Sequence, residues 1–272
     1  MKNILRGIKT VFMLAIALAL TVAVIARPEG SAEAPPEDYA NADSTQDQGI
    51  VGTINWIVDS LKGEPDLSEY PEGLRELYEK NPDARDFVLG YFDEHSAAGP
   101  EDIDLSSLDI SSVPLLMQWD QRWGYAEYSG ELLGLSGCGP TCLSMAAIYL
   151  THDTDLNPLY VARYATEQGY YCQGMGSTWT LFSEGASGLG LRATELPLDE
   201  YIIDRALAEG KPVVLSLGPG DFTDTGHFIL VTGLTDDGYI VNDPNSYQNS
   251  KTIWKYEDIR DQILNLWSME RA

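Results

Sequence analysis

The chain has 272 residues, of which 44% are hydrophobic and 10% aromatic, which suffices for one substantial packed domain and additional segments. Its 42 Asp and Glu against 17 Lys and Arg give a formal net charge of -25. A charge of this size repels nucleic acid and anionic lipid headgroups, so nucleic-acid partners are excluded. Acidic residues also keep a protein soluble, and nothing gathers them at metal-ligand spacing, so we expect neither a metal ion nor another cofactor.

The first 26 residues predict export. Lys2, Arg6 and Lys9 precede an uncharged apolar stretch from Thr10 to Ala26, which is the pattern of a signal peptide. The stretch is short for a membrane span and ends in small residues suited to cleavage, although a membrane anchor stays open as the alternative. We therefore expect the protein to be secreted or to lie on the extracellular face of the cell membrane, with membrane contact only through this segment.

Two further segments precede the main domain. Residues 27–49 are rich in Pro, Ala, Glu and Asp with few apolar side chains, which predicts a disordered acidic linker. Residues 50–112 form a predicted helical extension and a connecting segment. Its apolar residues recur at helical spacing from Ile54 to Leu61, Pro71 begins a helix over Glu72–Lys80, and Asn81 with Pro82 begins another that runs to about Glu94. The apolar faces of these helices need a surface to bury against, and the main domain is the candidate.

Residues 113–272 form the predicted main domain, in which helices come before strands. Helices are expected over about Cys138–Leu150, Asn157–Glu167 and Thr178–Leu189, strands over Val213–Leu217, His227–Thr232, Tyr239–Val241 and Lys251–Tyr256, and a closing amphipathic helix over Asp258–Trp267. An Asp237-Gly238 turn joins two of the strands. Helices followed by an antiparallel sheet predict an α+β fold.

Cys138 is the first candidate for chemistry. It lies in Gly137-Cys138-Gly139-Pro140, a turn that enters the predicted helix at its amino end. The free N–H groups and the dipole of a helix start favour a thiolate, and the flanking glycines leave room for a substrate carbonyl. An isolated cysteine at such a turn is more often a small buried residue, so the case depends on what accompanies it.

His227 and Asp243 are the second candidates, because the sequence places them on one hairpin. His227 begins one predicted strand and Asp243 follows the next, so their side chains are expected within about 5–8 Å of each other. A carboxylate beside an imidazole fixes its tautomer and stabilises the imidazolium, as in a catalytic triad. The ordinary alternatives are a satisfied histidine and a turn-forming aspartate. His95 and His152 are expected to be exposed at helix ends.

Four separated motifs lie at Val113–Gly124, Ser136–Thr141, Gly226–Gly233 and Asn242–Pro244, and together with their surroundings they cover about Val113 to Trp267. They resemble the motifs of the bacteriocin-processing, double-glycine leader peptidases, especially of their stand-alone exported type. The resemblance implies a papain-like cysteine peptidase fold, with the nucleophile helix at the amino end of the domain packed on an antiparallel sheet. It also implies that Cys138 and His227 are catalytic, that Asp243 orients the histidine, and that Gln118 lines the oxyanion hole.

The expected function is that of an exported cysteine peptidase or amide hydrolase, with a Cys-His-Asp triad and an acyl-enzyme intermediate. A peptide or protein is the expected substrate. A transpeptidase, a cell-wall peptide amidase and a non-enzymatic surface binding module stay open, as does the oligomeric state. A structural surface protein would leave the Cys, His and Asp arrangement unexplained.

The cysteine count raises a separate question. Cys138, Cys142 and Cys172 are the only three cysteines, and an odd number in an exported chain predicts one free thiol. A bridge between Cys142 and Cys172 would leave Cys138 free in an oxidising compartment. Two small buried thiols are the alternative.

Overall fold

The computed structural model describes residues 65–94 and 102–272. The predicted signal segment, the acidic linker and the helix near Ile54 lie outside these residues, as does His95. The described chain from Leu67 to Ala272 forms one compact unit. None of its helices is long and apolar enough to cross a membrane.

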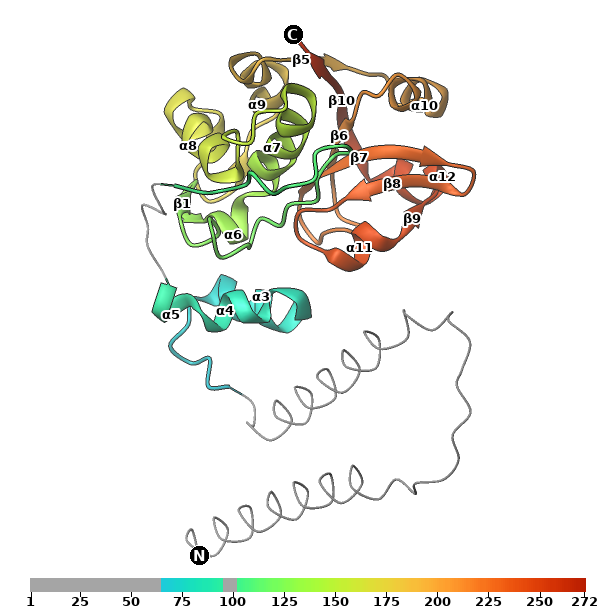
Figure 1. The fold of residues 1–272 in the computed structure, drawn as a ribbon. Helices are drawn as coiled ribbons and strands as arrows, with labels where there is room; N and C mark the ends of the chain where they lie inside the picture. Colours follow the sequence, from blue (N-terminus) through green and yellow to red (C-terminus); the bar gives the residue numbers. More distant parts are fainter. Residues whose placement is uncertain (1–64, 95–101) are drawn as a thin grey trace, which may run out of the picture. The chain divides into compact units, whose positions relative to one another are not determined.

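A six-stranded antiparallel sheet forms the centre of this unit (Figure 1). Its strand order is β5-β10-β6-β7-β8-β9. The strands span Leu191–Glu195 (β5), Val213–Leu217 (β6), His227–Thr235 (β7), Gly238–Asn242 (β8), Ile253–Trp254 (β9) and Ile263–Arg271 (β10). The predicted Asp237-Gly238 turn is confirmed: Thr235 pairs with Gly238, whose φ of 138° suits glycine.

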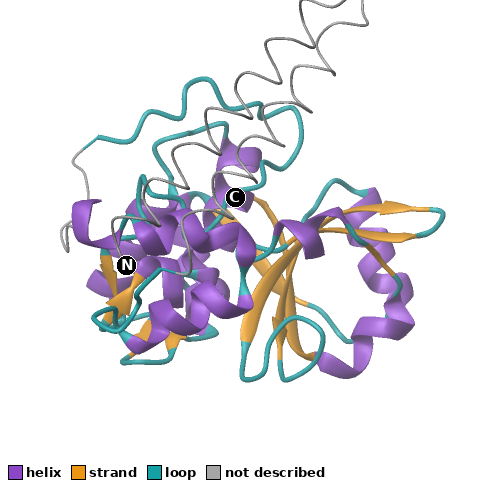
Figure 2. Cartoon of the chain, turned by 90° about the horizontal axis from the view of Figure 1, so that it is seen from below, coloured by secondary structure: helices purple, strands orange, loops and turns teal. Residues whose placement is uncertain are grey.

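The helices and short hairpins lie around this sheet, as the colouring in Figure 2 shows. Before the sheet come β1 (Glu127–Tyr128), β2 (Glu131–Leu132), α6 (Leu133–Ser136), α7 (Cys138–Thr151), α8 (Pro158–Gln168), β3 (Tyr171–Cys172), β4 (Gly176–Ser177), α9 (Thr180–Ser183) and the 3-10 helix η2 (Gly185–Leu189). Within the sheet region lie α10 (Glu200–Ala208), α11 (Tyr247–Lys251), α12 (Tyr256–Ile259) and the 3-10 helix η3 (Arg260–Gln262).

The two faces of the sheet bury different side chains, because neighbouring residues of a strand point to opposite sides. Phe228 and Leu230 of β7 belong to the core that contains α7 and α8. Ile229 and Val231 belong to a second core, with Ile203 from α10. Helix α7 is buried from Gly139 to Ile148 and is the central helix of the first core. These features confirm the predicted α+β fold, in which the helix that begins at Cys138 packs on an antiparallel sheet.

From Leu67 to Glu94 the helical extension belongs to the compact unit and packs on the main domain. It consists of α3 (Glu72–Lys80), the 3-10 helix η1 (Pro82–Ala84), α4 (Arg85–Leu89) and α5 (Tyr91–Glu94). A third core joins apolar residues of this extension to residues that flank Gln118 and precede Cys138, namely Leu74, Leu77, Ala84, Phe87, Val88, Met117, Trp119 and Tyr125, with Leu132 and Leu135 packed against them. The predicted helix from Asn81 to Glu94 is present as three short pieces.

The predicted closing helix over Asp258–Trp267 is wrong. Its apolar residues Ile259, Ile263 and Leu266 fit a helical period, but only α12 and η3 are helical, and the chain from Ile263 forms strand β10. Between Ile263 and Asn265 the pairing with β6 shifts register, which hides the two-residue alternation of a strand. This segment forms a strand and not a helix because β5 and β6 pair with it on both sides, and because Trp267 stacks on Phe182 with ring centroids 5.4 Å apart.

Smaller differences occur elsewhere. The predicted helix Thr178–Leu189 is divided into α9 and η2, and the predicted strand Lys251–Tyr256 is reduced to β9. Strand β5 and helix α10 were not predicted. Asp199 caps α10 by accepting from the N–H of Ile202 at 3.2 Å, a signal that the sequence carried.

Candidate active site

Cys138 is the first residue of α7, as predicted. Its two glycine neighbours serve close packing and not an open approach. A Cβ at Gly137 would collide with the carbonyl oxygen of Leu133, and a Cβ at Gly139 would collide with the Ser177 hydroxyl. The glycines therefore let α6 and β4 approach the helix start closely, which holds the Cys138 backbone in place. Cys138 itself is partly exposed.

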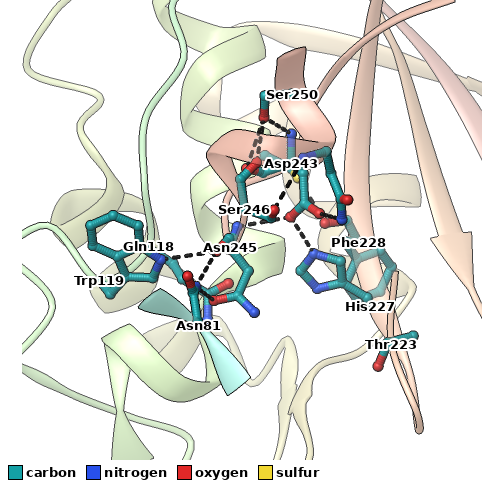
Figure 3. A network of polar contacts seen from close by, with 12 residues as sticks. Asn81, Gln118, Trp119, Thr223, His227, Phe228, Asp243, Asn245, Ser246 and Ser250 are labelled. Atoms are coloured by element: carbon teal, nitrogen blue, oxygen red, sulfur yellow. Dashed lines mark hydrogen bonds and ion pairs between the residues drawn. The ribbon is translucent and has the colours of Figure 1, made fainter. Parts of the chain in front are cut away.

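His227 and Asp243 are brought together by β7 and β8. His227 is the first residue of β7, and Asp243 directly follows β8, whose last residue Asn242 pairs with Leu230. The imidazole Nε2 lies 2.7 Å from Oδ1 of Asp243 (Figure 3). Both side chains are buried, with exposed fractions of 7% and 1%. Nδ1 is then the ring atom left for Cys138.

The carboxylate of Asp243 has a partner on each oxygen. Oδ1 also accepts from the backbone N–H of Asn245 at 2.8 Å, and Oδ2 accepts from the Asn249 side chain at 2.7 Å. The backbone N–H of Asp243 donates to the Ser250 hydroxyl at 2.9 Å. Ser246 begins α11 by capping the N–H of Asn249 at 3.1 Å, and so presents Asn249 to the carboxylate. A carboxylate with this many donors is held ionised and in one orientation.

Charge and hydrogen bonding favour an imidazolium beside this carboxylate. Burial is the largest single effect on His227 and lowers its pKa, but the charge and hydrogen bond of Asp243, followed by those of Cys138, outweigh it and raise the pKa to about 10. For Asp243, burial is again the largest effect and raises the pKa. His227, Asn249 and the N–H of Asn245 together reverse it and hold the pKa below its usual value. The site therefore favours a paired imidazolium and carboxylate at neutral pH.

Gln118 lies against the segment that precedes Cys138. Its Nε2 donates to the carbonyl oxygens of Gly134 at 2.9 Å and Leu135 at 3.2 Å, and its Oε1 is buried without a hydrogen-bond partner. Both amide hydrogens thus face carbonyls in this conformation. The role of Gln118 in an oxyanion hole stays a prediction.

The bridge between Cys142 and Cys172, which the sequence left open, is not formed, and all three cysteines are free. Cys142 is fully buried in α7, where its thiol donates to the carbonyl of Phe228 at 3.3 Å. Cys172 is exposed on β3. Burial above all raises the pKa of Cys142 well above its ordinary value, so this thiol is unsuited to attack.

Some supporting residues escaped prediction. Asn245, Asn249 and Ser250 all act on Asp243, but in the sequence they look like an ordinary turn after Pro244. Among the residues that the structure describes, no group of three His, Cys, Asp or Glu could hold a metal ion. His152 is exposed at the end of α7, as predicted.

Comparison with known proteins agrees with the motifs. The family model described as the Peptidase_C39-like family matches residues 110–271. Among solved structures, the peptidase domain of Streptococcus ComA, a bi-functional ABC transporter involved in a quorum sensing pathway, is 18% identical with a TM-score of 0.40, over 50% of this chain and 93% of that one. A C39-like peptidase from Bacillus anthracis is 15% identical with a TM-score of 0.40, over 61% of this chain and 98% of that one. The search of curated proteins gave no match.

The family match covers more than half of the chain and includes all four candidate site residues. It confirms the resemblance that the sequence motifs indicated, and supports a cysteine peptidase-like function with peptide or protein substrates. The protein belongs to the Peptidase_C39-like family.

Proposed function

We propose that the protein is an exported cysteine peptidase that cleaves peptide or amide bonds through a thioester on Cys138. The observation that carries the proposal is the buried contact of 2.7 Å between His227 and Asp243. Cys138 also contributes to the raised pKa of the same imidazole. A nucleophile, a base and an orienting carboxylate in this relation form a catalytic triad.

In the proposed first half-reaction, the Cys138 thiolate attacks the carbonyl carbon of the substrate. A C–S bond forms, and the carbonyl electron pair moves to oxygen. The His227 imidazolium then gives its proton to the leaving amine as the C–N bond breaks, which leaves a thioester and a neutral imidazole. Asp243 stays ionised throughout and holds the imidazole through Nε2, so that Nδ1 carries the transferred proton.

In the second half-reaction, water replaces the amine. Neutral His227 takes a proton from water while the oxygen adds to the thioester carbon. The C–S bond then breaks, which releases the acid and restores the Cys138 thiolate and the His227 imidazolium. The same thioester could instead pass its acyl group to an amine, which would make the protein a transpeptidase.

Two donors are proposed for the oxyanion. One is the backbone N–H of Cys138 at the start of α7, where helical N–H groups have no partner within the helix. The other is the side-chain amide of Gln118. This second role requires one amide hydrogen to exchange a carbonyl for the oxyanion, and the longer contact, to Leu135 at 3.2 Å, is the one we assign.

We further propose that the enzyme acts outside the cytoplasm, secreted or on the extracellular face of the membrane. Lys2 to Ala26 motivate this location. The sequence of the amino terminus in the extracellular fraction tests it. A start near Arg27 would indicate cleavage and an intact Met1 in the membrane an anchor, whereas a soluble intact chain in the cytoplasm would refute export.

The enzymatic proposal is tested by trapping the thioester site and following the fate of the acyl group. A thiol-reactive peptide electrophile should label Cys138, and Cys138→Ala should abolish both this label and turnover. Cys172→Ala is the matched control, since it removes an exposed thiol and should leave turnover unchanged. Peptides cleaved in ¹⁸O-water should carry ¹⁸O in the new carboxyl group. Transfer of the acyl group to an added amine would instead identify a transpeptidase. A folded chain that is neither labelled at Cys138 nor able to turn over a substrate would refute the peptidase and indicate a binding module.

A further inference from the structure

The turn between α3 and η1 contacts the loop that carries Asp243. The Asn81 side chain donates from Nδ2 to the backbone carbonyl of Asn245 at 2.5 Å and lies 3.4 Å from the Asn245 Oδ1 (Figure 3). The indole Nε1 of Trp119 donates to the same backbone carbonyl at 3.0 Å. Asn81 precedes the family match at residues 110–271, so the contact comes from the helical extension.

The contacted loop is the one that orients the carboxylate. The backbone N–H of Asn245 donates to Oδ1 of Asp243 at 2.8 Å, and the same oxygen faces Nε2 of His227 at 2.7 Å. A shift of Asn245 would therefore remove one donor from the oxygen that holds the histidine.

Two consecutive peptide groups of this loop are held from outside it. The backbone N–H of Gln118 donates to the carbonyl of Pro244 at 2.8 Å, which fixes the peptide group that contains the Asn245 N–H. Asn81 and Trp119 hold the next peptide group through the Asn245 carbonyl. The extension thus supplies one of three anchors.

The Asn81 amide is itself held in place. Its Oδ1 accepts from the backbone N–H of Asp83 at 3.1 Å as the cap of η1, which turns Nδ2 towards Asn245. The helices on either side are anchored by Leu74 and Phe87, whose exposed fractions are 0% and 2%. Asn81 is therefore presented from a packed support.

We propose that Asn81 is a positioning residue of the active site, whose amide holds the Asn245 turn so that Asp243 keeps the imidazole of His227 in its working orientation. The kinetic part of this inference rests on the proposed peptidase function. The helical extension then completes the site that the main domain carries.

Asn81→Ser separates positioning from capping. A serine hydroxyl still caps η1, but it is too short to reach the Asn245 carbonyl. We expect the pKa of His227, followed by NMR of its imidazole, to fall. kcat should fall about three- to tenfold with a smaller change in KM, which is the usual effect of losing one hydrogen bond. Trp119→Phe keeps the ring but removes the N–H to the same carbonyl, and should shift the His227 titration in the same direction.

Lys80→Ala is the matched control. Lys80 precedes Asn81 and pairs with Asp224 at 3.3 Å, but both side chains are exposed, and such pairs contribute little. This variant should leave the His227 titration unchanged.

Two outcomes would overturn the inference. One is an unchanged His227 titration in Asn81→Ser, even with a lower melting temperature, because Asn81 would then serve only the fold. The other is an equal shift in Lys80→Ala, which would make the charge of the extension responsible. The His227 titration can be measured without substrate turnover. A wild-type chain without peptidase activity would therefore refute the proposed function, and the titration would still decide the role of Asn81.

Discussion

His227 Nε2 lies 2.7 Å from Asp243 Oδ1, and this contact leaves Nδ1 as the ring nitrogen that can exchange a proton with Cys138 or the substrate. The imidazole is thereby fixed at one end and free to exchange protons at the other. Because the negative charge of Asp243 raises the pKa of His227, it should affect the pH dependence of catalysis.

We expect turnover to persist into alkaline solution and to fall near pH 10, where the imidazolium that protonates the leaving amine is lost. Asp243→Asn removes the opposite charge, so the pKa of His227 should fall. The alkaline limb of kcat/KM should move down by roughly 1 to 3 pH units, the usual effect of an opposite charge at contact distance. Rates of peptide cleavage across pH for the two proteins provide the measurement. An unmoved limb would mean that another group controls it.

The same proton links stability to pH. His227 binds its proton more tightly in the folded chain, so the imidazolium stabilises the fold fully below about pH 6.5, and this contribution is lost as the pH rises through about 10. Asp243 has a lowered pKa, so its contribution is present above about pH 3.8 and is lost on further acidification. Denaturant unfolding of wild type and His227→Gln should therefore show a free-energy difference that shrinks between about pH 6.5 and 10. A difference that stays constant over this interval would contradict the protonated state of His227.

The three thiols should react very differently with iodoacetamide. Cys138 should react fastest, because it is partly exposed at the first residue of α7 and acts with His227 in the proposed triad. Cys172 should react as an ordinary exposed thiol, and Cys142 only after unfolding, because it is fully buried. His227→Ala should slow the labelling of Cys138 relative to that of Cys172. Mass mapping of each labelled peptide gives the rates, and a Cys142 to Cys172 disulfide in the unreduced chain would contradict the structure.

Gln118→Ala tests the oxyanion role. Turnover of an amide or ester substrate should fall by about a hundredfold to a thousandfold, while alkylation of Cys138 persists, because an oxyanion donor acts on charge that develops in the transition state. The change also removes the donor to Gly134 and Leu135, so a loss of stability of about 1–3 kcal/mol is expected as well. Assays well below the melting temperature of the variant separate the two effects. Equal turnover in the two proteins would exclude Gln118 from the site.

The positions of Cys138, His227 and Asp243 in the fold could be predicted from the sequence, because each follows from a local pattern. Cys138 is the first residue of a helix whose start is predicted by the neighbouring glycines and proline. His227 and Asp243 lie on a hairpin whose turn is predicted by Asp237-Gly238. The features that the sequence did not predict depend on contacts between residues far apart in the chain. Strand β10 is a strand because β5 and β6 lie on either side of it, and the contact of Asn81 with Asn245 spans 164 residues. No local period encodes either relation.

The core shared by α3, α4 and the segment around Trp119 determines where the chain can be truncated for recombinant expression. A recombinant piece that begins where the family match begins, at residue 110, would leave Met117, Trp119 and Tyr125 facing water where Leu74 and Phe87 now cover them. An apolar patch of this kind promotes aggregation. The smallest self-sufficient chain should begin near Leu67, some forty residues before the recognisable peptidase sequence.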